Sequence, residues 1–192
     1  VLGPQDGILK EESEVMPETP YGFSKLAGEE YSLFYSLEFN LPVTVIRYFN
    51  SYGPGEYPGK YRNVIPNFID LALKNEPLTI TGTGEETREF VYVSDTITGT
   101  LQASVDDNSL GKVFHLGSGQ RVSINNLATM ILDICDSKSK IKYLPKRSWD
   151  HILHRETSIK KAQSTFNYSP EVALEEGLVL MVEWMKKNAG PY

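Results

Sequence analysis

The sequence has one cysteine, three histidines and no long apolar run. A single cysteine excludes a disulfide within one chain, and the apolar stretch around Cys135 favours a buried thiol over a nucleophile or ligand. No apolar run has the length needed to cross a bilayer, and the first residues resemble neither the basic nor the hydrophobic part of a signal peptide. These absences predict a cytoplasmic protein without a membrane partner.

Positive charge is also scarce, with 19 Lys and Arg against 25 Asp and Glu. The net charge of -6 argues against nonspecific nucleic-acid binding. Residues 138–161 reverse this balance and predict a local anion site. Arg147 and Arg155 are the better candidates for phosphate contacts, because a guanidinium binds phosphate in a bidentate manner. The alternative for most of this segment is a set of solvated surface lysines.

A metal site is not expected. Asp150, His151 and His154 are close in sequence, but the third histidine, His115, is distant and no set of ligands is complete. A loop that contacts a nucleotide is the preferred interpretation of this segment.

The hydrophobic content of 40% in 192 residues is typical of a globular protein, and predicted helices and strands alternate along the chain. Helices are predicted at residues 20–40, 64–75, 94–105, 124–135, 158–166 and 174–187, with Ser94 and Ser123 as N-caps of the third and fourth. Strands are predicted at 43–49, 78–81, 89–93, 113–116 and 141–144. The order predicts an α/β fold with a buried parallel strand at 43–49.

Tyr21 and Lys25 are four residues apart on the first predicted helix, which begins at Thr19 and Pro20. This spacing places a phenol beside an ammonium group. A free tyrosine has a pKa near 10, and a neighbouring cation lowers it. The pair therefore suits proton abstraction, although chance alone yields about one such pair in a chain of this composition.

A long loop with several Gly and Pro residues, at 50–62, follows the predicted strand 43–49. It is too long for a simple connection. In open α/β sheets ligands bind beyond the carboxyl ends of the strands, so this loop is a candidate part of a site.

The order of these segments resembles the extended short-chain dehydrogenase/reductase family of nucleotide-sugar epimerases, dehydratases and decarboxylases. The resemblance covers nearly the whole chain, and the ordered set of motifs is far more specific than any one of them. The motifs are Tyr21-Gly22-Phe23-Ser24-Lys25, Arg47-Tyr48-Phe49-Asn50-Ser51-Tyr52-Gly53-Pro54, Asn63-Val64-Ile65-Pro66, Gly82-Thr83-Gly84-Glu85 through Thr87-Arg88-Glu89-Phe90-Val91-Tyr92-Val93-Ser94-Asp95, His115-Leu116-Gly117-Ser118-Gly119, and Lys146-Arg147 leading into Ser158-Ile159-Lys160-Lys161-Ala162.

This resemblance implies that Tyr21 is the catalytic base and that Lys25 lowers its pKa and binds the nicotinamide ribose of NAD. It also implies a place for Tyr48 near the nicotinamide. Residues implied to bind the nucleotide-diphosphate sugar are Asn50, Asn63, Arg88, Arg147 and Arg155. The residues themselves leave other roles open. Tyr48 and Phe49 suit a core, Asn63 suits a helix cap, and Arg88 suits a surface salt bridge to a neighbouring glutamate.

The sequence departs from the family's pattern at its front. It contains no Gly-x-x-Gly-x-x-Gly or Gly-x-Gly-x-x-Gly turn, and Leu2 stands where relatives have the tyrosine of Val-Tyr-Gly. The resemblance implies that the catalytic Ser or Thr lies before Val1. We therefore expect a fragment of a longer protein that by itself binds NAD weakly or not at all. Its expected parts are residues 1–50 and 94–118 of a Rossmann domain, and residues 51–93 and 119–192 of a smaller α/β substrate domain.

The resemblance implies NAD-dependent modification of a nucleotide sugar by a homodimer, and we expect 4-epimerisation of a UDP-sugar through a 4-keto intermediate. A 4,6-dehydratase and a UDP-glucuronate decarboxylase remain open, because the distinguishing residues precede Val1. The alternative outside the enzymes is a noncatalytic protein that binds sugar nucleotides. Retention of both Tyr21 and Lys25 argues against it.

Overall fold

The computed structural model describes residues 1–192 apart from 4, 6, 61–62, 147–154 and 189–192. The described helices are α1 (Pro20–Phe39), α2 (Val64–Leu73), α3 (Val93–Val105), the 3-10 helix η1 (Asp107–Ser109), α4 (Ile124–Cys135), α5 (Lys160–Phe166) and α6 (Leu174–Lys187). The described strands are β1 (Gly7–Leu9), β2 (Val45–Tyr48), β3 (Ser51–Tyr52), β4 (Leu78–Thr81), β5 (Thr87–Glu89), β6 (Val91–Tyr92), β7 (Val113–Leu116), β8 (Arg121–Ser123), β9 (Ile141–Leu144) and β10 (Arg155–Thr157).

These strands form pairs, and most of the pairs are parallel. The parallel pairs are β1–β10, β2–β7, β3–β6 and β4–β9, whereas β5 and β8 are antiparallel. Parallel pairing joined by helices confirms the predicted α/β class.

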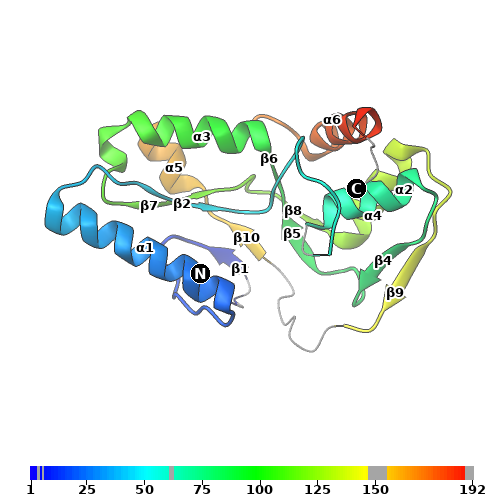
Figure 1. Cartoon of the computed structure of the whole chain (residues 1–192), viewed down its shortest axis with the longest axis horizontal. Coiled ribbons are helices and arrows are strands. Elements are labelled where there is room, and N and C mark those ends of the chain that lie inside the picture. Colours follow the sequence, from blue (N-terminus) through cyan, green and yellow to red (C-terminus); the bar gives the residue numbers. More distant parts are fainter. Residues whose placement is uncertain (4, 6, 61–62, 147–154, 189–192) are drawn as a thin grey trace.

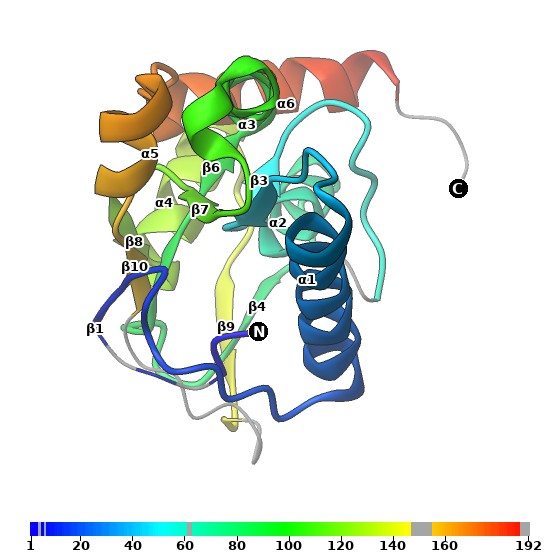
Figure 2. The ribbon, with the colours of Figure 1, turned by 90° about the vertical axis from the view of Figure 1, so that its left-hand side faces the viewer.

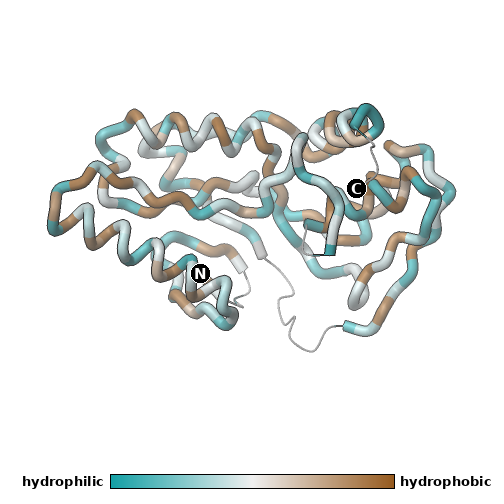
Figure 3. The backbone as a smooth tube through the Cα atoms, viewed as in Figure 1, coloured by the Kyte–Doolittle hydropathy of each residue, from teal (hydrophilic) through white to brown (hydrophobic). Residues whose placement is uncertain are grey.

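One part of the molecule is built on β2 and β7. In Figure 1, α1 lies on one side of these strands and α3 and α5 lie on the other, and α1 remains apart from α3 and α5 in the turned view of Figure 2. Hydrophobic residues colour both strands (Figure 3). A buried core joins β7, α3, α5 and the segment after α5, and consists of Ala103, Phe114, Leu116, Ile159, Ala162, Phe166 and Tyr168.

The other part has a larger core between α2, α4, α6 and the strands β4 and β6. Its largest fully buried side chains are Tyr52, Ile65, Ile69, Leu78, Ile80, Leu127, Ile131, Leu178 and Met181. Cys135 packs against this core, where burial raises the pKa of its thiol and makes it a poor nucleophile. No helix in the described part of the chain has the length and apolarity needed to span a membrane.

Most predicted elements are confirmed to within a few residues. At the start of α1, Thr19 Oγ1 accepts a hydrogen bond from the Gly22 amide at 3.0 Å, and at the start of α4, Ser123 Oγ accepts one from the Asn126 amide at 3.2 Å. Both side chains therefore cap helix N-termini: Ser123 is the predicted N-cap, and Thr19 caps a helix at the start that the sequence predicts.

Three local predictions are wrong. Ser94 is not an N-cap, because α3 begins at Val93 and Tyr92 occupies the cap position. The predicted strand 89–93 is divided between β5 and β6, which pair with different partners. The strand 43–49 is only half-buried, because β7 is its single partner among the described strands.

The division into two domains stays a prediction. The packing of Ile46 against the core of Ala103, Phe114 and Leu116 is compatible with it. However, Ile159 and Ala162, which the prediction assigns to the substrate domain, belong to the same core. The segment from Ile159 to Tyr168 therefore contributes to the first core.

Candidate active site

The carboxyl end of β2 and the first turn of α1 lie at the same end of the first part. Helix α1 runs away from the middle of the molecule, turns at Asn40, which has a φ of 51°, and the chain returns along β2 (Figure 1). Strand β7 is parallel to β2, so it ends at this edge as well. Residues at the starts and ends of these elements are thus gathered where ligands bind in parallel α/β sheets.

Tyr21 and Lys25 lie on the first two turns of α1, and Lys25 Nζ is 5.5 Å from the centroid of the Tyr21 ring. The predicted juxtaposition of cation and phenol is therefore present in the structure. Tyr21 is 71% exposed, so its hydroxyl is accessible to a ligand. The helix start is fixed by the Thr19 cap and by Pro20, whose missing amide costs nothing at this position.

Tyr48 ends β2 and is 52% exposed, so it belongs to no core among the described residues of this chain. Its hydroxyl is 3.1 Å from Thr100 Oγ1 of α3. Phe49 is buried beside Leu2 and Leu9, so the core interpretation holds for it.

Asn50 has a φ of 44°, a left-handed conformation that asparagine tolerates better than most residues. Its Nδ2 donates to the Glu89 carbonyl at 2.8 Å. The side chain thereby ties the end of β2 to β5 and has a partner within the protein. A contact of Asn50 to substrate stays a prediction.

Asn63 stands at the N-cap position of α2 but makes no side-chain cap. Its Nδ2 donates to Glu56 Oε1 at 2.8 Å and to the Ser51 carbonyl at 3.3 Å. The alternative of a simple cap is therefore wrong, and Asn63 instead holds the loop between β3 and α2 in place.

Arg88 is on β5, opposite Val122 of β8. Opposite residues of an antiparallel pair present their side chains on the same face. Arg88 Nη1 donates to the Thr87 carbonyl at 2.9 Å, while Glu85 accepts from Asn125 and Glu86 accepts from the Gly84 amide. Of the other two predicted arginines, Arg147 lies outside the described residues together with Asp150, His151 and His154, and only the backbone of Arg155 is described, in β10.

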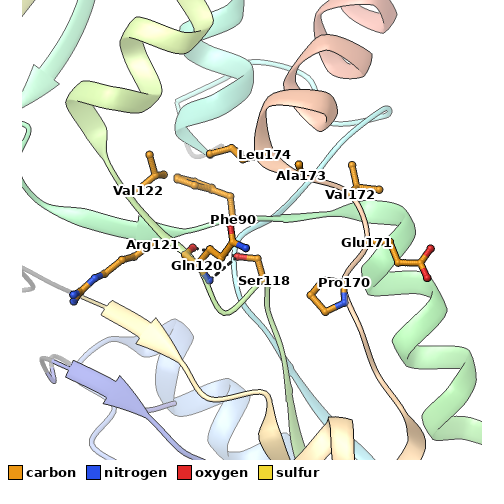
Figure 4. Close-up of a pocket in the computed structure, with 10 residues that line it drawn as sticks. All are labelled: Phe90, Ser118, Gln120, Arg121, Val122, Pro170, Glu171, Val172, Ala173 and Leu174. Atoms are coloured by element: carbon orange, nitrogen blue, oxygen red, sulfur yellow. Dashed lines mark hydrogen bonds between the residues drawn. The ribbon is translucent and has the colours of Figure 1, made fainter.

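A cavity of ≈ 340 Å³ lies beside the β5–β8 ribbon. Figure 4 shows its lining, in which Phe90 and Val122 lie on one side and the strap between α5 and α6 lies on the other. The lining residues are Phe90, Ser118, Gln120, Arg121, Val122, Pro170, Glu171, Val172, Ala173 and Leu174. Asp95 fixes the strap, because its carboxylate accepts the amides of Glu171 and Val172, both at 3.1 Å.

Glu89 is a buried carboxylate that the sequence did not single out. Its two oxygens accept the amides of Gly119 and Thr157, both at 2.7 Å, so it joins β5 to the loop after β7 and to β10. Burial raises the pKa of this carboxyl, although the backbone donors act in the opposite direction. Its place in the polar stretch Thr87-Arg88-Glu89 before apolar residues was the available signal.

A second buried polar cluster lies under α1. Arg47 and Glu29 form an ion pair with side chains 9% and 6% exposed, and His115 Nε2 is 3.3 Å from Arg47 Nη1. The signal for Arg47 was a charged residue within an otherwise apolar strand.

Comparisons with known proteins agree on a family. The model of the NAD dependent epimerase/dehydratase family matches residues 1–117. The chain is 35% identical over 172 residues to UDP-N-acetyl-alpha-D-glucosaminuronate decarboxylase of Bacillus cytotoxicus, covering 87% of this chain and 53% of that protein. It is also 35% identical over 180 residues to a putative UDP-glucose 4-epimerase of Methanocaldococcus jannaschii, covering 94% of this chain and 57% of that protein.

Among solved structures, the chain is similar to UDP-glucuronic acid 4-epimerase from Bacillus cereus in complex with UDP-glucuronic acid and NAD. The TM-score is 0.89 at 32% identity, and the match covers 98% of this chain and 59% of that one. The chain thus spans little more than half the length of the proteins that it matches.

Proposed function

Because the chain belongs to the NAD-dependent epimerase/dehydratase family, we propose that the whole protein is an NAD-dependent enzyme that modifies nucleotide sugars, and that its reaction is 4-epimerisation of a UDP-sugar. The observation that carries the proposal is the juxtaposition of Lys25 Nζ and the exposed Tyr21 ring at the edge where β2 and β7 end.

The residues at this edge fit one end of NAD. Lys25 offers three donors on a flexible stem, which suits the hydroxyls of a ribose, and Tyr48 offers an exposed aromatic face at the end of β2. Tyr21 and Lys25 would hold the nicotinamide ribose, and Tyr48 would lie near the nicotinamide. NAD, when bound, supplies the acceptor for a hydride.

Tyr21 acts on the proton that accompanies this transfer. Its phenolate accepts the proton of the sugar 4-hydroxyl, and returns it when the 4-keto sugar is reduced on its other face. Lys25 supplies a positive charge beside the phenol throughout. The exposed position of Tyr21 leaves space for a sugar to approach its hydroxyl.

We assign the nucleotide diphosphate to Arg88, Arg147 and Arg155, because guanidinium groups bind the oxygens of a diphosphate in pairs. Asn50 and Asn63 are assigned to the substrate at the loop after β2. Both asparagines have protein partners, so their contribution is to hold this loop in shape as much as to contact a ligand.

The family includes more than one reaction, so membership of it does not by itself specify 4-epimerisation. The decarboxylase of B. cytotoxicus and the putative epimerase of M. jannaschii are both 35% identical to the chain over the matched residues. Epimerisation, 4,6-dehydration and decarboxylation all begin with oxidation at the sugar C4, so Tyr21 and Lys25 would serve each of these reactions. A noncatalytic sugar-nucleotide-binding protein has no use for this pair.

The reaction is tested by incubating the full-length protein with NAD and, separately, with UDP-glucose, UDP-galactose and UDP-glucuronate. Products are identified by NMR. We expect interconversion of 4-epimers without release of carbon dioxide or loss of water. Carbon dioxide from UDP-glucuronate identifies a decarboxylase, and a stable 4-keto-6-deoxy product identifies a dehydratase. Binding of the sugar nucleotides without turnover identifies the noncatalytic alternative.

We also propose a homodimer in the cytoplasm. The outer side of α1 supports association, because it exposes Tyr31, Phe34, Tyr35, Leu37 and Phe39. Light scattering of the full-length protein measures the association state. A monomer at micromolar concentration contradicts the dimer.

A further inference from the structure

Helix α1 buries a charged side chain against the rest of this chain. Of its twenty residues, all of them described, only Gly22 and Glu29 are buried. A buried charge needs a partner, and a partner on the sheet is also a means of fixing the position of α1 along the strand.

Glu29 provides such a means through Arg47 of β2. Arg47 Nη2 is 2.6 Å from Glu29 Oε1 and Arg47 Nε is 3.0 Å from Glu29 Oε2, so two parallel hydrogen bonds join the side chains. A bidentate fork of this kind fixes direction as well as distance.

The same guanidinium also contacts the segment that leads into α1. Arg47 Nη1 donates to the Glu11 carbonyl at 3.2 Å, and the Glu11 carboxylate accepts the His115 amide of β7 at 3.0 Å. One side chain therefore gathers α1, the segment before it and both strands of the β2–β7 pair.

The spacing connects this cluster to the reactive pair. Tyr21, Lys25 and Glu29 follow one another at intervals of four residues, so neighbouring members meet along one side of the helix. Glu29 is about 12 Å from Tyr21 along the helix axis. Arg47 directly precedes Tyr48, so the ion pair sets the position of Tyr21 relative to the end of β2.

A buried ion pair adds little net stability compared with apolar residues of similar size, because both charges must be desolvated. What the ion pair supplies instead is a fixed orientation of α1 relative to β2. We propose that Glu29 and Arg47 are positioning residues, whose ion pair holds Tyr21 and Lys25 in the register that proton transfer needs. The inference rests on the function proposed above for Tyr21 and Lys25.

The test removes the two directional hydrogen bonds between Glu29 and Arg47 while keeping the fold. In the double variant Glu29→Leu/Arg47→Met of the full-length protein, apolar side chains replace both charges, and such replacements commonly preserve stability. We expect kcat for the sugar-nucleotide reaction to fall by about 100-fold with KM nearly unchanged, because a misplacement of about 1 Å has such an effect. The exposed neighbour supplies the control, Glu30→Gln, which should leave both constants unchanged.

The single variant Arg47→Lys keeps the charge and removes the fork. It should lose kcat in the same way, and a fully active Arg47→Lys protein overturns the proposal. An unchanged kcat in a folded double variant also overturns it. If the double variant does not fold, the result for Arg47→Lys decides.

A readout that does not depend on turnover separates this inference from the proposed function. With 3-fluorotyrosine incorporated only at position 21, the 19F resonance reports the surroundings of that ring. We expect it to broaden or split in the double variant and to stay single in Glu30→Gln. If the unmodified protein shows no turnover, the proposed function fails, and an unchanged resonance in the double variant then overturns the positioning role as well.

Discussion

His115, which lies beside Arg47 beneath the candidate site, is held in one protonation state by its surroundings. Burial, and then the positive charge of Arg47, lower the pKa of His115 to about 3 from an ordinary value of 6.5. His115 is fully buried and is therefore neutral in the folded protein at neutral pH. A neutral imidazole at this place leaves the attraction between Arg47 and Glu29 unopposed by a second positive charge.

The pKa of His115 predicts a pH dependence of stability. Below pH 6.5 the unfolded chain binds a proton at this residue and the folded chain does not, so stability falls as the pH decreases from 6.5 towards about 3. Between pH 6.5 and about pH 5 the loss should be about 2 kcal/mol. The measurement is urea unfolding of the protein and of His115→Gln at several pH values.

The His115→Gln variant isolates the contribution of His115 to the pH dependence of stability, because all other titrating groups are present in both proteins. We expect the free energy of unfolding of His115→Gln to decline less steeply with decreasing pH than that of the unmodified protein. Parallel curves would show that His115 is protonated in the folded state or is not buried.

Helices α1, α3 and α4 differ in whether a side chain accepts a hydrogen bond from the backbone amides of the first turn. Thr19 and Ser123 accept amides through their hydroxyls, whereas α3 starts after Tyr92 with no side-chain cap. Ser94 lies one residue inside α3 and is exposed. The same residue type therefore has different energetic roles at two helix starts.

Removing the two serine hydroxyls should have unequal effects. Ser123→Ala should lower the free energy of unfolding by about 1 kcal/mol, because the Asn126 amide loses its acceptor. Ser94→Ala should change it by less than about 0.5 kcal/mol, since this hydroxyl caps nothing. Urea unfolding of both variants at one pH measures the difference. Equal losses would contradict the assigned helix start.

Elements with a long pattern or a cap were predictable from the sequence. The helices α1, α4 and α6 and the strands β4, β7 and β9 lie close to their expected bounds. Strands β1, β3, β8 and β10 were not foreseen, because segments of two or three residues carry no periodicity and exist only through their partners.

Within the candidate site, the juxtaposition of Tyr21 and Lys25 was predictable from the sequence, but the residues that hold the surrounding elements together were not. Tyr21 and Lys25 are local neighbours on one helix, so spacing sufficed. The ion pair of Glu29 with Arg47, and the hydrogen bonds of Glu89 to Gly119 and Thr157, join residues far apart in sequence. No local pattern specifies such partners.

At the scale of the whole molecule, the assignments proposed above give the chain one end of a dinucleotide site. It carries Tyr21, Lys25 and Tyr48, and it lacks the glycine-rich turn whose amides bind a pyrophosphate at a helix N-terminus. We predict that residues 1–192 alone bind NAD with a Kd above about 1 mM. Isothermal titration calorimetry measures this, and tight binding by residues 1–192 would contradict the assignment of NAD contacts.

The central claim is that Tyr21 is the base of an NAD-dependent reaction on a sugar nucleotide. Its most direct test is kcat of the full-length Tyr21→Phe variant, with Tyr31→Phe, another exposed tyrosine of α1, as the matched control. We predict that Tyr21→Phe lowers kcat by about 100- to 10,000-fold while binding of the sugar nucleotide persists, and that Tyr31→Phe remains active. A fully active Tyr21→Phe protein would contradict the account.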